Sequence, residues 1–362
     1  MSDRGDRRPP EPPDAESVRR EAGVEPAEPI EVEPVDGDAG DPGPPPGAAD
    51  EGPAGEPPGD EETVGEPFGG GMAGEVEVAP GGEPFRSGFV TIVGRPNVGK
   101  STLLNRILGQ KVSIVSKRPQ TTRHRIVGVL NRPDCQVVFV DTPGIHKPRT
   151  ALGERLNVAA ETSIEDVDVV AMVVDATQPL GRGDRWVAAR VPRDAVVVVN
   201  KIDTARPAQV LQQLADASEL DLSEYFPVSA RTGEGVPELV EHLISRLPPG
   251  PRYYPEDMVT DVPEAFWVAE LVREQLLAVA REELPHSIAT RVTEWEWPYI
   301  RCEIIVERES QKGIVIGKRG EVLKRVGTAV RRQLPEGAYL DLHVKVDKDW
   351  QRRPHALDRL GF

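Results

Sequence analysis

The residues best suited to chemistry lie in one stretch, Gly94 to Ser101, which matches the pattern G-x-x-x-x-G-K-[ST]. This pattern forms a loop whose backbone N–H groups converge on phosphates, while the lysine adds positive charge and the hydroxyl is available to Mg²⁺. Residues 89–93 (FVTIV) are typical of a short buried strand, and residues 101–108 (STLLNRIL) have the apolar spacing of a helix. The sequence therefore predicts a phosphate cradle between a strand and a helix. The residues expected to contact a nucleotide here are Gly94, Arg95, Pro96, Asn97, Val98, Gly99, Lys100, Ser101 and Thr102.

A second short motif follows another predicted strand, Val137–Val140 (VVFV), which leads directly into the tetrapeptide DTPG. A carboxylate at the end of a strand can reach Mg²⁺, commonly through water. The glycine gives the next loop a backbone amide and the freedom to move with a γ-phosphate. The residues expected to contact the nucleotide here are Asp141, Thr142, Pro143 and Gly144.

Two more motifs point to recognition of a base. The apolar run 195–199 (AVVVV) ends in the tetrapeptide NKID, and Pro227–Val228 leads to the sequence SARTG. A carboxylate only accepts hydrogen bonds, so Asp203 can take two from the N1–H and 2-amino groups of guanine, whereas adenine offers neither donor. A backbone amide of the second motif could reach the guanine O6. The residues expected at the base are Asn200, Lys201, Asp203, Ser229, Ala230 and Arg231. Each motif alone is weak, but this order, each after a β run, indicates a guanine-nucleotide switch.

The three stretches 94–105 (GRPNVGKSTLLN), 119–125 (PQTTRHR) and 141–146 (DTPGIH) resemble the Era family of bacterial ribosome-assembly GTPases. The second stretch is the most specific, since most related GTPases carry another sequence there. The likeness extends from about Ser87 to residue 362. It implies an α/β Ras-like P-loop GTPase domain followed by an α+β KH domain of type 2, which binds RNA. It also implies a cytoplasmic monomer that acts on 16S rRNA and the 30S subunit.

The resemblance also assigns roles within the catalytic site. It implies that Lys100, Thr122 and Gly144 are catalytic and that Ser101, Thr122 and Asp141 hold Mg²⁺, with Thr121 as the fallback for the switch threonine. Ile145 stands where Ras has a water-orienting glutamine, and an apolar side chain cannot orient water. Relatives with such a residue hydrolyse GTP slowly alone and depend on other groups, on a partner or on a monovalent cation. Asn97 matches the asparagine that cradles K⁺ in some of them. His124 matches a family position, but neither it nor His146 has the spacing of a metal site.

Residues 1–86 have a composition of their own. They contain 23 acidic and 6 basic residues, a net charge of −17, together with 17 Pro and 16 Gly. Such a segment cannot bury enough apolar surface to offset its chain entropy, so we expect it to be disordered. It lacks the apolar core of a signal peptide. It could be a solvated spacer, a docking arm, or an acidic decoy that competes with RNA for a basic domain. Residues 87–362 carry 38 basic and 37 acidic side chains, so the low overall pI reflects this segment alone.

The remaining 276 residues suit two domains. Alternating strands and helices predict a mostly parallel sheet over residues 87–247, with a linker at 248–259 that begins PPGP. We expect the linker tyrosines to pack one domain against the other. A second domain follows at 260–350, then a tail at 351–362. The two cysteines, Cys135 and Cys302, exclude a disulfide framework, and no apolar run is long enough for a membrane span.

The second domain carries the turn GKRG at residues 317–320, after an Ile/Val-rich segment and before a predicted helix at 321–333. Glycines in such a G-x-x-G turn let a sugar-phosphate backbone approach closely, and basic flanks attract it. The residues expected to contact RNA are Lys312, Gly317, Lys318, Arg319, Gly320, Lys324 and Arg325. Era-like proteins commonly end this loop with two glycines, and Arg319 departs from that pattern. The tryptophans Trp267, Trp295 and Trp297 are expected in the core rather than at bases.

Together these features predict a ribosome-assembly factor that binds and hydrolyses GTP. It would hold the 3′ region of 16S rRNA, assist 30S biogenesis and switch between GTP and GDP states. One alternative is a nucleotide-gated signalling GTPase of the cell cycle or the membrane, associated peripherally with the inner face of the cell membrane. Another is a constitutive RNA-binding protein with a vestigial nucleotide site. The intact phosphate loop argues against the latter, and the basic G-x-x-G turn argues against the former.

Overall fold

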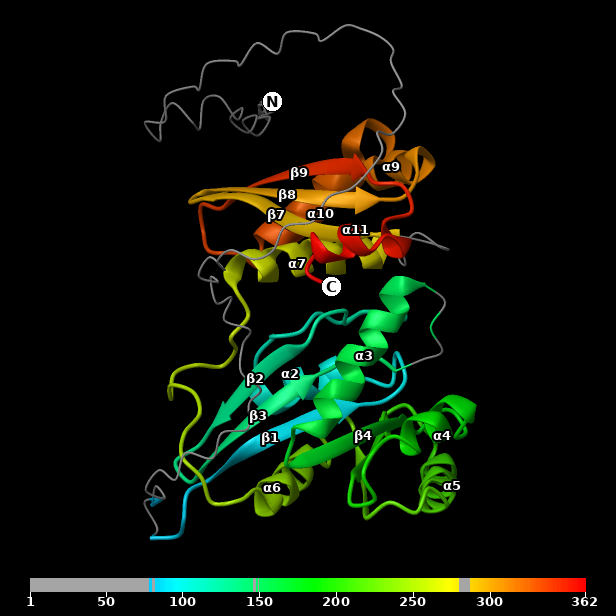
Figure 1. Cartoon of the computed structure of the whole chain (residues 1–362), viewed down its shortest axis with the longest axis vertical. Coiled ribbons are helices and arrows are strands. Elements are labelled where there is room, and N and C mark those ends of the chain that lie inside the picture. The colour runs from blue at the N-terminus through cyan, green and yellow to red at the C-terminus, as the bar shows by residue number, and fades with distance from the viewer. Residues whose placement is uncertain (1–77, 80–81, 146–147, 149, 280–286) are drawn as a thin grey trace, which may run out of the picture. The chain divides into compact units, whose positions relative to one another are not determined.

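The structure is a computed structural model, and it describes residues 78–79, 82–145, 148, 150–279 and 287–362 (Figure 1). Most of the segment predicted to be disordered, and also His146, therefore lie outside the described residues. The predicted boundary at residue 86 is wrong. Val78 pairs with Pro84 in an isolated β-bridge, Phe85 is fully buried, and the Arg252 guanidinium lies 4.4 Å from the centre of its ring. The folded chain begins before Ser87 because Phe85 provides an apolar anchor within an otherwise polar composition.

The first sheet has six strands in the order β2-β3-β1-β4-β5-β6, and all neighbours are parallel except β2 and β3. The strands are β1 (Arg86–Val93), β2 (Ile126–Asn131), β3 (Cys135–Asp141), β4 (Val169–Asp175), β5 (Val196–Asn200) and β6 (Glu224–Val228). In β4 and β5 every residue is buried, as expected for strands covered on both faces. Because β1, β3 and β5 are parallel, the loops that follow them leave from one edge of the sheet.

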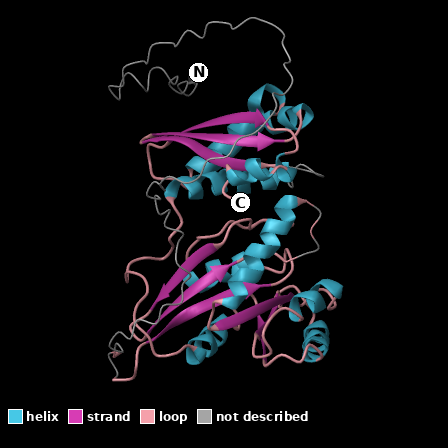
Figure 2. Ribbon diagram, in the orientation of Figure 1, coloured by secondary structure: helices cyan, strands magenta, loops and turns pink. Residues whose placement is uncertain are grey.

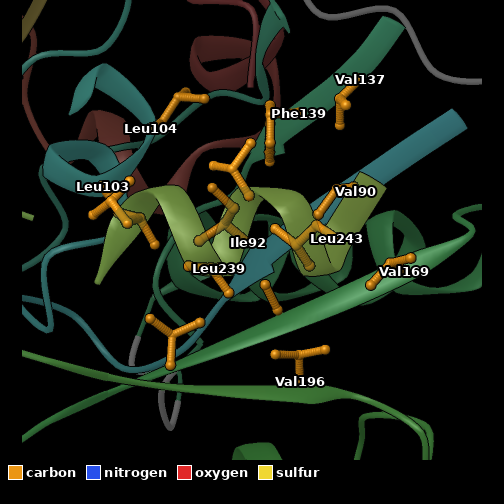
Figure 3. Close-up of a cluster of buried hydrophobic side chains, with 14 of the residues drawn as sticks. Val90, Ile92, Leu103, Leu104, Val137, Phe139, Val169, Val196, Leu239 and Leu243 are labelled. Carbon is orange, nitrogen blue, oxygen red and sulfur yellow. The ribbon is translucent and has the colours of Figure 1, made fainter. Parts of the chain in front are cut away.

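Helices cover both faces of this sheet (Figure 2). They are α2 (Lys100–Leu108), α3 (Ala151–Glu165), α4 (Arg182–Ala188), α5 (Pro207–Ser218) and α6 (Val236–Arg246). Leucines of α2 and α6 pack on one face, and Figure 3 shows Leu103, Leu104, Leu239 and Leu243 against the strand residues. Ala160, Val187 and Ala217, which belong to α3, α4 and α5, pack on the other face. The predicted mostly parallel sheet with helices on both faces is therefore confirmed.

The linker after α6 packs along the first sheet. The ring centre of Tyr253 lies 5.0 Å from that of Phe89, and the Gln136 side-chain oxygen accepts hydrogen bonds from the backbone amides of Tyr253 and Tyr254. Val129 of β2 donates to the carbonyl of Val259, so the linker also covers the edge strand. The expectation that the linker tyrosines pack one domain against the other is wrong, because they pack on the first domain.

The second domain follows the order helix, strand, strand, helix, helix, strand. Its elements are α7 (Glu264–Val279), β7 (Ala289–Glu296), β8 (Tyr299–Val306), α9 (Glu309–Ile316), α10 (Glu321–Arg331) and β9 (Tyr339–Val346). The sheet order is β7-β8-β9, antiparallel then parallel. Apolar side chains of α7, α9 and α10 form one core with the sheet. No described helix is long and apolar enough to cross a bilayer.

The expectation that Trp295 and Trp297 lie in the core is wrong. Trp295 and Trp297 are 36% and 51% exposed, because they lie at the hairpin between β7 and β8 while Ile300 fills the core there. The segment after residue 350, predicted as a C-terminal tail, packs on the rest of the chain. It contains α11 (Pro354–Asp358), and Leu357 is buried in a cluster with Trp350 and residues of α3.

Candidate functional site

A cavity of about 1120 Å³ opens at the edge of the first sheet where the predicted motifs meet. This volume slightly exceeds the usual range of about 300–1,000 Å³ for small-molecule sites, so the cavity has room for a nucleotide. Most of the residues predicted at the nucleotide line it. They are Pro96, Asn97, Gly99, Lys100, Ser101, Thr102, Thr122, Gly144, Asn200, Lys201, Asp203, Ala230 and Arg231. The structure therefore brings together four motifs that are spread over residues 94–233 of the sequence.

Oxygen atoms converge beside the phosphate loop. The hydroxyls of Ser101, Ser113 and Thr122 lie 2.7, 3.0 and 3.3 Å from Oδ2 of Asp141, and the Ser101 and Thr122 hydroxyls are 2.8 Å apart. The other carboxylate oxygen, Oδ1, is buried and has no hydrogen-bond donor among the described residues. Thr121, in contrast, donates its hydroxyl to the Arg118 carbonyl. Three hydroxyls and a carboxylate with one unsatisfied oxygen are suitable ligands for Mg²⁺, which prefers oxygen.

Lys100 is buried beside this cluster, and its ammonium donates to the carbonyls of Gly94 and Arg95, both at 3.1 Å. Burial lowers the pKa of Lys100 to about 8, and the negative charge of Asp141 opposes that shift. Burial has the opposite effect on the acid: it raises the pKa of Asp141 above its ordinary value, while Lys100 and the three hydroxyls oppose the shift. A bound polyphosphate would favour the charged lysine, because opposite charges stabilise each other strongly in a buried site.

At the far end of the cavity, side chains hold the base-recognition loops together. Asn200 donates to the Val98 carbonyl at 2.9 Å and accepts from the Ala230 amide at 2.9 Å, so it ties the phosphate loop to the last motif. Ser229 donates its hydroxyl to Oδ1 of Asp203 at 2.7 Å. The Ala230 amide already donates to Asn200. The next amide along the chain, that of Arg231, has no acceptor among the described residues, so it is the one that could donate to a guanine O6.

Several predicted residues support the cavity rather than line it. Arg95 pairs with the buried Asp184 of α4 at 2.6 Å, and Thr142 donates its hydroxyl to the Ile92 carbonyl. The other predicted residues that do not line the cavity are Gly94, Val98, Asp141, Pro143 and Ser229. Ile145 is buried in a cluster with residues of β4 and does not line the cavity. At Gly144 a Cβ atom would lie 2.8 Å from the Pro96 nitrogen, so only glycine allows this close approach to the phosphate loop.

The sequence did not reveal several residues that the structure brings to the site. Ser113 is buried on Asp141, and Asp175 at the end of β4 binds the Lys201 ammonium at 2.6 Å. Glu274 of α7 lines the cavity and accepts the Val115 amide at 3.0 Å, and Arg273 donates to the Thr121 carbonyl. No local motif signals these contacts, because each joins segments that are far apart in the chain.

The predicted RNA loop lies between α9 and α10. Gly317 and Gly320 have φ of +75° and +76°, and Arg319 between them has φ of +54°, a conformation that glycine adopts more easily. Lys318, Arg319, Lys324 and Arg325 are exposed, and Lys312 is half-buried. Within the described part of the chain, none of these five side chains forms an ion pair. The loop therefore presents uncompensated positive charge around two positions that lack a side chain.

Comparisons with known proteins identify both domains. A family model described as "50S ribosome-binding GTPase" matches residues 89–201, and one described as "KH domain" matches residues 283–351. The "GTPase Era" of Mycolicibacterium smegmatis is 49% identical over 296 residues, which are 77% of this chain and 99% of the relative. The chain belongs to the Era GTPase family. The "GTPase Era" of Mycobacterium tuberculosis is 48% identical over 297 residues, again 77% of this chain and 99% of the relative.

Solved Era structures have the same fold. A single-residue variant of the Aquifex aeolicus Era protein bound to GDP·AlF4⁻ is 40% identical, with a TM-score of 0.72 over 76% of this chain and 99% of its own. An Era protein in complex with MgGDPNP and nucleotides 1506–1542 of 16S ribosomal RNA is 41% identical, with a TM-score of 0.73 and the same coverage. The Era resemblance, the GTPase–KH architecture and GTP hydrolysis as the activity are thereby confirmed.

Proposed function

We propose that this protein is a GTP-driven assembly factor of the small ribosomal subunit, which holds the 3′ region of 16S rRNA with its KH domain. The observation that carries the proposal is the exposed basic G-x-x-G loop on the same chain as a cavity lined by residues of all four predicted nucleotide motifs. A 41% identical Era protein has been solved with MgGDPNP and a 16S rRNA fragment, which supports both ligands. We place the activity in the cytoplasm, where ribosomal subunits assemble.

Hydrolysis would rest on positioning and charge rather than on covalent chemistry. Lys100 would bind the phosphate oxygens, and the Gly144 amide would contact the γ-phosphate. Ser101, Thr122 and Asp141 would hold Mg²⁺, whose charge would offset the charge that develops on the phosphates. Since Ile145 is buried in the core, other groups must orient the attacking water. Product release would then loosen the loop around Thr122 and distinguish the GTP state from the GDP state.

Crosslinking the full chain to RNA in cells and sequencing the bound fragments tests this function. We expect the reads to concentrate at the 3′ end of 16S rRNA, since the KH loop is the part of the chain suited to single-stranded RNA. The Gly320→Asp variant should lose this signal at equal expression. Reads spread evenly over cellular RNA would contradict the assignment to 16S rRNA, and recovery of the protein on membranes without RNA would favour the signalling alternative.

We further propose that K⁺ assists hydrolysis through Asn97. The Asn97 side-chain amide donates to the Lys117 carbonyl at 3.1 Å, which joins the phosphate loop to the loop that leads to Thr122. The side-chain oxygen of Asn97 accepts no hydrogen bond from the described residues. It is therefore available as a cation ligand beside the Lys117 carbonyl. A monovalent cation there would add positive charge near the phosphates without a protein cation.

The expected result is a higher turnover in potassium chloride than in sodium chloride at the same ionic strength. Asn97→Ala should lose the potassium increment, because it removes the proposed cation ligand; it also removes the hydrogen bond to the Lys117 carbonyl, so its two rates are compared with each other. Single-turnover GTP hydrolysis in the two salts measures both. Equal rates for the unaltered protein in the two salts would rule out the potassium proposal and leave GTP hydrolysis untouched.

A further inference from the structure

The carboxylate that is suited to guanine is already in contact with a cation of the protein itself. Oδ2 of Asp203 lies 2.6 Å from a terminal nitrogen of the Arg231 guanidinium. This oxygen is buried, yet it lacks a well-aligned hydrogen bond from any described residue. The Asp203 side chain is 9% exposed, whereas that of Arg231 is 70% exposed. A largely buried acceptor is therefore held by a side chain that extends from the solvent.

The backbone around Arg231 is fixed independently of its side chain. Arg106 of α2 donates to the carbonyl of Ala230 at 3.1 Å and also to the carbonyl of Arg231. Ser229 accepts the Thr232 amide on its hydroxyl at 3.1 Å, which closes the turn. The Arg231 side chain can therefore leave Asp203 while the loop that carries Ser229 and Ala230 stays in place.

The contact has a chemical analogue in guanine. The edge of guanine that carries N1–H and the 2-amino group is itself a guanidine fragment, with two parallel N–H donors. An arginine guanidinium presents the same planar pair of donors to a carboxylate. Hypoxanthine lacks the 2-amino group and offers only the N1–H donor. Guanine needs both oxygens of Asp203 and therefore competes with Arg231 for Oδ2, whereas hypoxanthine needs only one of the two oxygens.

We propose that Arg231 is a displaceable substitute for guanine that binds Asp203 whenever the base leaves. This inference rests on the proposed guanine specificity of the site. Leaving a buried carboxylate without a partner is costly, and the positive charge of Arg231 offsets part of that cost when the nucleotide has departed. The residue therefore weakens guanine-nucleotide binding and lowers the energy needed for GDP release. The protein carries within its own base loop a group that favours exchange.

The test compares the affinities of the full chain for GDP and for inosine diphosphate, which carries hypoxanthine. Arg231→Ala should raise the preference for GDP, expressed as the ratio of the two Kd values, about two- to fivefold, the range expected for one partly exposed ion pair. Removing the Arg231 charge also weakens the long-range attraction of the protein for phosphate. This effect is the same for both nucleotides, so it cancels in the ratio. Arg231→Lys keeps the charge but not the planar donor pair, so its Kd ratio should lie between those of the unaltered protein and Arg231→Ala. Titrations with the unlabelled nucleotides by calorimetry give all the values.

The matched control is Arg193→Ala, since Arg193 is another exposed arginine paired with a carboxylate, Asp221, at 2.8 Å and outside the cavity. It should leave the ratio unchanged. A ratio that is unchanged or lower in Arg231→Ala would overturn the inference and indicate that Arg231 is neutral toward the base or helps to hold it. If the unaltered protein bound neither GDP nor inosine diphosphate, the proposed nucleotide site itself would fail, which is a separate outcome.

Discussion

Asp203→Asn is expected to cost on the order of 10⁴-fold in GTP affinity, because guanine would lose an acceptor in a site built to hydrogen-bond it. Xanthine carries a carbonyl where guanine has the 2-amino group, and the new amide can donate to that carbonyl. Binding of XTP should therefore improve in the variant while binding of GTP collapses. Ser229 does not obstruct the exchange, since its hydroxyl can donate to either side-chain oxygen at the observed 2.7 Å. Titrations with GTP, XTP and ATP measure the switch.

Asp221→Asn serves as the control for this experiment, because Asp221 is 87% exposed and its only ion pair in the described structure is with Arg193 at the surface. It should change none of the three affinities. Equal binding of ATP and GTP by the unaltered protein would disprove guanine recognition by Asp203. A variant that lost GTP without gaining XTP would instead point to a collapsed base loop, which thermal unfolding of the two proteins would reveal.

The parts of the site that the sequence predicted are those encoded by contiguous residues. The phosphate loop, DTPG and NKID each follow a β run, and the parallel sheet brings their ends to one edge without further information. The helix predicted at 321–333 begins at the residue where α10 begins and ends within two residues of its end, since a strong amphipathic pattern defines it. Thr122 was chosen from the resemblance alone, and its hydroxyl lies 2.8 Å from that of Ser101.

What the sequence could not predict depends on contacts between distant segments. Ser113 and Glu274 belong to no motif, and only the folded chain places them against Asp141 and the cavity. Phe85 was hidden by its polar surroundings, since composition averages over the one side chain that anchors the start of the fold. Trp295 and Trp297 show the opposite error, because an apolar residue type does not reveal that a hairpin end has no second layer to cover it.

In the KH domain, the two glycines of the RNA loop are expected to respond differently to substitution. A Cβ atom at Gly317 would lie 2.5 Å from a methyl carbon of Val322 and 3.0 Å from its backbone nitrogen, so Gly317→Asp would also disturb the start of α10. At Gly320 no heavy atom lies within 4 Å of the added Cβ atom, and the cost is limited to the positive φ. Gly320→Asp is therefore the cleaner test of RNA binding.

Gly320→Asp should reduce binding of a single-stranded fragment from the 3′ end of 16S rRNA below detection, because a side chain and a negative charge would block the approaching phosphate backbone. GTP hydrolysis without RNA should stay within about twofold, as surface substitutions change stability little. Gly337→Asp is the matched control, since Gly337 also has a positive φ of +93° with open space at its Cβ, but precedes β9 outside the loop. Fluorescence anisotropy titrations of the labelled fragment compare the three proteins. If Gly320→Asp and Gly337→Asp bound the fragment equally well, the G-x-x-G loop would not be the RNA site, and the basic residues of α10 would have to bind the strand without it.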